Sequence, residues 1–129
     1  MMIHDEMAHA IEQELGLTLG KDFMIAHPLD PVTKEQIGEP YIWEWKRPDI
    51  EKPDLKVMAA RFHETHHMSY AEKIARETRD YYLAQTDWTD NKTVSQAVHE
   101  KYAAYRQALR DITDQPGYPK NIDWPVKPV

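Results

Sequence analysis

An apolar stripe near the C-terminus constrains the fold of this chain more than any other feature. Its members recur at spacings of three and four residues, as on one face of an α-helix, and are Val94, Val98, Tyr102, Tyr105, Leu109 and Ile112. Thr93 and Gln96 have the spacing of a capping box, which predicts a helix from about Thr93 to Asp111. One face of this helix must be buried, so another element must pack against it.

A second helical pattern begins at Leu55 and extends to Gln85. Its apolar positions include Leu55, Met58, Ala59, Phe62, Tyr70, Ile74 and Tyr81. Ser69 and Glu72 form another capping-box pattern, so one long helix and two shorter helices both remain open. The short sequence TDWT, residues 86–89, forms a corner before the last helix. We therefore expect an antiparallel pair of helices.

Four prolines, at positions 116, 119, 125 and 128, keep the C-terminal tail from joining a helix. We expect this tail to be extended. Its one large apolar residue, Trp124, either folds back onto the helices or is presented to a partner.

The N-terminal part combines an amphipathic helix with two β-like runs. The helix is predicted over Ile3–Leu15 and ends at Gly16. The runs Phe23–Ala26 and Tyr41–Lys46 predict a small antiparallel hairpin. Strict alternation places Tyr41, Trp43 and Trp45 on one face, which we expect to pack in the core against the first helix. The alternatives are an exposed aromatic binding strip and a helix that docks on a partner.

Two prolines in the charged segment Arg47–Asp54 mark a boundary. The predicted organisation is an N-terminal region over residues 1–47, a linker over 48–54 and a helical region over 55–129. The fold class is therefore α+β: an N-terminal helix with a hairpin, then an antiparallel helical pair with an extended Pro-rich tail.

Composition excludes several classes of function. The chain has a net charge of −6, so a general attraction to nucleic acid is not expected. It contains no cysteine, which excludes disulfides and thiolate chemistry. No apolar run is long enough to span a bilayer, and the N-terminus lacks a signal-peptide pattern. We expect neither a nucleic-acid partner nor a membrane partner.

The segment His63–His67 satisfies the HExxH pattern of zinc metallopeptidases. In that pattern His63 and His67 would bind the metal, and Glu64 would be the general base. Polar residues surround the segment, and Tyr70 stands where the extended motif has glycine. We therefore interpret it as a surface cluster, with a small zinc hydrolase as the lesser alternative. With no other catalytic grouping, we expect neither an enzyme nor a cofactor.

Three motifs follow one another between Arg76 and Pro128: a TDWT corner, the helical run YRQALRD, and a Pro-Gly turn followed by a Trp-Pro pair. With the helix before the corner, they comprise Arg76, Arg79, Leu83, Ala84, Thr86, Asp87, Trp88, Thr89, Tyr105, Arg106, Gln107, Ala108, Leu109, Arg110, Asp111, Gln115, Pro116, Gly117, Pro119, Trp124, Pro125 and Pro128. In this order they resemble the C-terminal region of bacteriophage tail assembly chaperones and tail fibre assembly proteins.

The resemblance implies a phage or prophage protein that binds a tail or tail fibre protein in the cytoplasm of the bacterial host. It would assist the folding, oligomerisation or attachment of that partner. The alternative is a permanent component of the tail or fibre tip, associated with the finished virion. Residues 1–75 lie outside the resemblance and would supply partner specificity.

Trp, Tyr and Arg are the residue types most often found at interface hot spots, and several cluster in the recognisable segment. We expect the partner to contact Trp88, Tyr105, Arg106, Arg110 and Trp124. Structural roles are the alternative: Trp88 would close the corner between the helices, and Tyr105 would lie in their core. Arg106 and Arg110 would then pair with Glu77 or Asp111.

Overall fold

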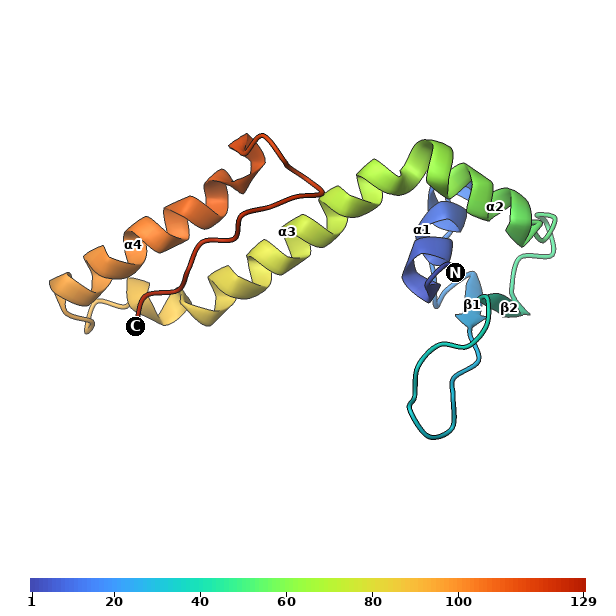
Figure 1. Ribbon diagram of the computed structural model, residues 1–129, viewed down its shortest axis with the longest axis horizontal. Coiled ribbons are helices and arrows are strands. Elements are labelled where there is room, and N and C mark those ends of the chain that lie inside the picture. Colours follow the sequence, from blue (N-terminus) through green and yellow to red (C-terminus); the bar gives the residue numbers. More distant parts are fainter. The chain divides into compact units, whose positions relative to one another are not determined.

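The computed structural model describes residues 1–129 as two compact units, Met1–Tyr70 and Ala71–Val129. The first unit contains α1 (His4–Leu15), β1 (Phe23–Ala26), β2 (Tyr41–Trp45), α2 (Leu55–Arg61) and the π-helical turn η1 (Phe62–His66) (Figure 1). The helix α3 (His67–Gln85) begins there and continues into the second unit, which also contains the 3₁₀ turns η2 (Asp87–Asp90) and η3 (Asp111–Asp114) on either side of α4 (Gln96–Arg110). The predicted α+β class is confirmed. None of the helices combines the length and the apolar character needed to cross a membrane.

The core of the first unit lies between α1, the hairpin and α2. Its buried side chains include Met7, Ala10, Ile11, Phe23, Ile25, Ile42, Met58 and Phe62. The helix α1 begins where the Glu6 carboxylate accepts a hydrogen bond from the Ile3 backbone N–H at 3.0 Å. It ends at Gly16, whose φ of +68° is the left-handed conformation that glycine adopts without steric cost. Both ends of this helix were predicted from the sequence to within one residue.

A bulge in the hairpin changes which aromatic residues are buried. Phe23 pairs with Trp45 and Ile25 pairs with Ile42, so Trp43 is left over as an extra residue on β2. Ile42 is therefore buried, whereas Trp43 remains 55% exposed and Tyr41 50% exposed. The expectation that Tyr41 and Trp43 pack in the core was wrong, because it assumed unbroken alternation. Trp45 is half-buried against the core.

The segment after β2 packs on the first unit. The indole N–H of Trp45 donates to the backbone carbonyls of Arg47, at 2.7 Å, and Ile50, at 2.9 Å. Ile50 itself contacts the core. Residues 48–54 thus lie within the first compact unit, and the division of the chain at this segment remains a prediction about independent folding.

The backbone is helical without a break from Leu55 to Gln85, which resolves the alternatives that the sequence left open. Five residues of this run, Phe62–His66, form a π-helical turn. Ser69 does not cap a new helix: its hydroxyl donates to the His66 carbonyl at 3.0 Å and lies 2.8 Å from His9 Nε2. Glu14 of α1 accepts hydrogen bonds from Arg61 at 2.8 Å and from His66 at 2.7 Å. These contacts join α1 to the π-helical turn.

In the second unit, α4 begins three residues later than its predicted start. The cap is Ser95, whose hydroxyl accepts a hydrogen bond from the Val98 N–H. Thr93 is not the cap, because its N–H and its hydroxyl both donate to the Asn91 side chain. The run from Asn91 to Ser95 therefore forms a turn. The prediction that Thr93 caps this helix was wrong.

The Pro-rich tail runs back between α3 and α4 (Figure 1). Its Trp124 ring lies 5.5 Å from the Tyr82 ring of α3, and its Pro128 carbonyl accepts a hydrogen bond from the Tyr102 hydroxyl of α4. The Gln115 side chain and the Asp123 backbone exchange two hydrogen bonds of 2.8 Å, which fold the start of the tail. The tail therefore contacts both helices.

Candidate functional site

Two of the five contact residues predicted from the sequence, Trp88 and Arg106, lie at the corner between α3 and α4, and the buried Arg106 holds this corner in place. Arg106 of α4 is only 6% exposed. Its Nη1 donates to the Leu83 carbonyl and to the Thr86 hydroxyl, both at 2.7 Å. Its Nη2 donates to Asp87 at 3.0 Å and lies 3.5 Å from Asp90. One guanidinium group therefore binds both a backbone carbonyl at the end of α3 and the acidic side chains of η2.

Two threonines complete the corner from inside. Thr86 and Thr89 are fully buried, with exposed fractions of 0% and 1%. The Thr86 hydroxyl donates toward the Leu83 carbonyl at 3.2 Å, and the Thr89 hydroxyl donates to the Thr86 carbonyl at 2.7 Å. Each hydroxyl thus donates to a backbone carbonyl that also accepts a backbone N–H, so each threonine adds one hydrogen bond within the corner.

Trp88 lies between these threonines in the sequence but faces outward. It is 51% exposed, and its ring centroid lies 5.3 Å from that of Tyr102 on α4 in an edge-on arrangement. The backbone on both sides of Trp88 is fixed by the bonds to Arg106 and the threonines. The corner thus presents a large aromatic side chain from a rigid support.

The other predicted contact residues take different positions. Tyr105 is buried. This burial raises the pKa of its hydroxyl group, and the neighbouring Tyr82 phenol raises it to a smaller extent. Trp124 is half-buried on Tyr82, so the tail is folded back. Arg110 is exposed and forms no ion pair. The five residues do not form one continuous surface, and their contact with a partner remains a prediction.

Sequence reasoning missed the partners of Arg106. It expected Glu77 or Asp111, whereas the structure pairs Arg106 with Asp87 and Asp90, and Asp111 instead accepts a hydrogen bond from Gln107 at 3.0 Å. Two features of the sequence could have indicated this pairing: Arg106 lies next to the apolar stripe of α4, and the TDWT corner contains Asp87. A buried arginine requires an acceptor, and Asp87 lies in the corner where the chain reverses.

The HExxH segment falls at the π-helical turn. His63 and Glu64 are exposed, and the His63 ring packs edge-on against Phe62 at 5.6 Å. His67 is half-buried and its Nδ1 has no hydrogen-bond partner, while His66 is engaged with Glu14. No group of three or more His, Cys, Asp or Glu side chains is placed to hold a metal ion. His63 and His67 thus lack a third ligand in this arrangement.

Comparison with known families supports the sequence resemblance. Residues 72–129 match the phage tail assembly chaperone family. The match begins one residue after the start of the second compact unit, and it includes the corner, Arg106 and the Pro-rich tail. No curated protein and no solved structure matches the chain.

The family indicates a role in phage tail assembly as a chaperone, which implies interaction with phage tail proteins. Residues 1–71 lie outside the match.

Proposed function

We propose that this chain is a phage or prophage tail assembly chaperone that binds a tail or tail fibre protein through the outer side of the corner. It acts by binding, without catalysis, in the cytoplasm of the bacterial host. By covering apolar surfaces of its partner, it assists folding, oligomerisation or attachment of that partner.

The exposure of Trp88 is the observation that supports this proposal most directly. An exposed Trp ring contributes a large apolar area to an interface, and it loses little conformational entropy if its support is already rigid. Arg106 supplies that support, because four of its neighbours belong to the segment from Leu83 to Asp90.

The remaining predicted contact residues divide into two roles. Arg110, exposed on the same helix as Tyr102, is available to pair with a carboxylate of the partner. Tyr105 and Arg106 support the corner from inside, and Trp124 holds the tail against α3. We propose that the partner contacts Trp88 and Arg110 directly.

Co-purification from cells that express the neighbouring tail genes tests this proposal. The tagged wild-type chain is expected to capture a tail or tail fibre protein, and Trp88→Ala is expected to lower the affinity at least tenfold, as for an interface hot spot. Tyr81→Ala is the matched control, because Tyr81 is a 63% exposed aromatic residue of the same unit outside the corner. Equal loss in both variants, or in neither, would contradict the proposal.

Finished particles separate a chaperone from a permanent tail component. Purified virions are expected to lack the chain, whereas a fixed number of copies per particle would assign it to the tail or fibre tip. Immunoblotting of gradient-purified particles makes this distinction.

A further inference from the structure

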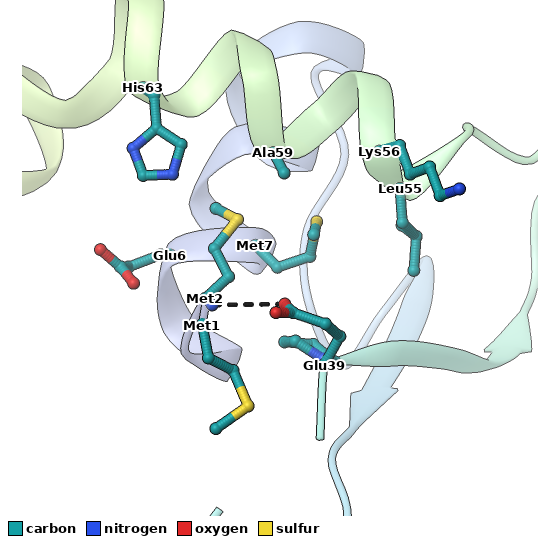
Figure 2. Close-up of a pocket in the computed structure, with 10 residues that line it drawn as sticks. Met1, Met2, Glu6, Met7, Glu39, Leu55, Lys56, Ala59 and His63 are labelled. Carbon is teal, nitrogen blue, oxygen red and sulfur yellow. Dashed lines mark hydrogen bonds between the residues drawn. The ribbon is translucent and has the colours of Figure 1, made fainter. Parts of the chain in front are cut away.

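The first unit contains an open groove that the proposed function leaves unassigned. It lies between the N-terminus, α1, the residues just before β2 and α2, and has a volume of about 610 Å³ (Figure 2). Its apolar lining comprises Met1, Met2, Met7, Pro40, Leu55 and Ala59.

Methionine dominates the lining. Three of the six methionines in the chain line the groove, and Met2 and Met7 form its buried floor with exposed fractions of 5% and 2%. The methionine side chain is unbranched and polarizable, so it adapts to apolar groups of different shape. Surfaces rich in methionine therefore suit the recognition of apolar side chains on another protein.

Two carboxylates stand at the edge of this apolar lining. Glu39 accepts a hydrogen bond from the Met2 N–H at 3.3 Å (Figure 2). Glu6 accepts one from the Ile3 N–H at 3.0 Å. These bonds fix both carboxylates beside the methionines. Lys56 and His63 also line the groove, and the ammonium group of Lys56 points away from the methionines (Figure 2).

The first unit as a whole is also negatively charged, like Glu6 and Glu39. Residues 1–70 hold seven Lys and Arg against thirteen Asp and Glu, a net charge of −6, whereas residues 71–129 hold nine of each. A second copy of the chain would bring an equally acidic unit to the groove and would be repelled. An occupant with apolar and basic residues would be attracted.

We infer that this groove receives a basic amphipathic helix of the tail protein, with apolar side chains on the methionine floor and Lys or Arg beside Glu6 and Glu39. Helices that dock in apolar grooves anchor themselves with side chains spaced three and four residues apart. This inference rests on the proposed function and names the chemistry by which the first unit selects its partner.

Methyl NMR of the full chain labelled with ¹³C-methyl methionine tests the inference. The probe is a synthetic helical peptide with Leu at positions one, four, five and eight and Lys on the opposite face, and the control peptide has Glu in place of Lys. The Lys peptide is expected to shift the methyl signals of Met2 and Met7 while those of Met24 and Met68, which do not line the groove, stay unchanged. It is expected to bind at least about tenfold more tightly than the Glu peptide at low salt.

Two variants with matched controls locate the binding. Ala59→Phe fills the groove from α2 and is expected to weaken the Lys peptide about tenfold, whereas Val57→Phe, at an exposed position of the same helix, leaves the affinity unchanged. Glu39→Gln keeps an acceptor oxygen for the Met2 N–H but removes the charge, and is expected to weaken binding about threefold. Its control is Glu51→Gln, an exposed carboxylate away from the groove.

Equal affinity for both peptides, or methyl shifts that do not involve Met2 and Met7, would overturn the inference. Shifts of Met2 and Met7 that depend on protein concentration without peptide would assign the groove to a second copy and overturn it as well. The proposed function fails separately. If Ala59→Phe captures the tail protein like the wild type while Trp88→Ala does not, the chaperone proposal stands and the groove inference falls.

Discussion

The two compact units differ in charge and in how they hold their exposed aromatic residues. The first carries the entire net charge of −6, while the second has equal numbers of basic and acidic side chains. In the second unit Trp88 is exposed between two buried threonines that fix its backbone, whereas in the first Trp43 is exposed as the extra residue of a bulge. We propose a division of roles, in which the second unit, which contains the family match, contacts the tail protein and the first unit provides selectivity.

The largest expected effect comes from removing most of the first unit. Deleting residues 1–52 is expected to abolish selectivity for the tail protein, because it removes α1, the hairpin and the groove, but to leave the helical pair folded. Circular dichroism and co-purification with a panel of tail proteins measure both effects. Loss of all helical signal on this deletion would contradict the proposed division.

A pair of substitutions in β2 tests the bulge in the first unit. Ile42→Ala is expected to lower the free energy of unfolding by about 2–4 kcal/mol, since it removes a buried side chain and leaves a cavity. Trp43→Ala is expected to cost well under 1 kcal/mol, because its side chain is more than half exposed. Chemical denaturation of the two variants measures the difference. A larger effect at Trp43 would restore the unbroken alternation expected from the sequence.

The corresponding test in the second unit compares Arg106 and Arg110, the two arginines in the C-terminal part of α4. Arg106→Met is expected to cost about 2–3 kcal/mol, because it removes the buried guanidinium whose hydrogen bonds join α4 to the Leu83 carbonyl, the Thr86 hydroxyl and Asp87. Arg110→Met, at an exposed position without an ion pair, is expected to change stability by less than about 0.5 kcal/mol. Hydrogen exchange of residues 83–90 reports the loss locally. Similar exchange in both variants would mean that Arg106 does not hold the corner.

A smaller effect on stability is expected on acidification. It should distinguish the two units, because the first unit contains several carboxyl groups with a lowered pKa. Hydrogen bonds from His66 and then Arg61 lower the pKa of Glu14, and the Arg47 guanidinium lowers the pKa of Asp49 to about 2. Hydrogen bonds from backbone N–H groups lower the pKa of two more carboxyl groups of the first unit. The largest cause is the Thr18 N–H for Asp22 and the Thr33 N–H for Asp30. A group with a lowered folded-state pKa contributes stability above its unfolded pKa and loses it as the pH falls through the folded value.

The first unit is therefore expected to lose hydrogen-exchange protection before the second as the pH falls from about 5 toward about 2. Native-state exchange analysed separately for residues 1–70 and 71–129 measures this order. Earlier loss in the second unit would show that other groups control its acid stability.

The sequence predicted those elements whose signals are local. Glycine after an apolar stripe ended α1 at Leu15, and two β-like runs formed the hairpin. The start of α4 was misplaced because Thr93 and Ser95 both suit a cap, and the choice depends on the Asn91 side chain that binds Thr93.

Features that depend on distant partners were not predictable. The bulge at Trp43 depends on the register of β1, and the partners of Arg106 lie about twenty residues earlier in the chain. The candidate residues were found by type and by resemblance, but only the structure separated Trp88 and Arg110 at the surface from Tyr105 and Arg106 inside. Burial of a charged side chain cannot be read from composition.

The central claim is that the Arg106-supported corner contacts the tail protein. Hydrogen exchange of the full chain, free and in complex with the captured tail protein, tests it most directly. Binding is expected to add protection to residues 86–90 and to the facing part of α4 around Tyr102. Protection that leaves this corner unchanged in the complex would contradict it.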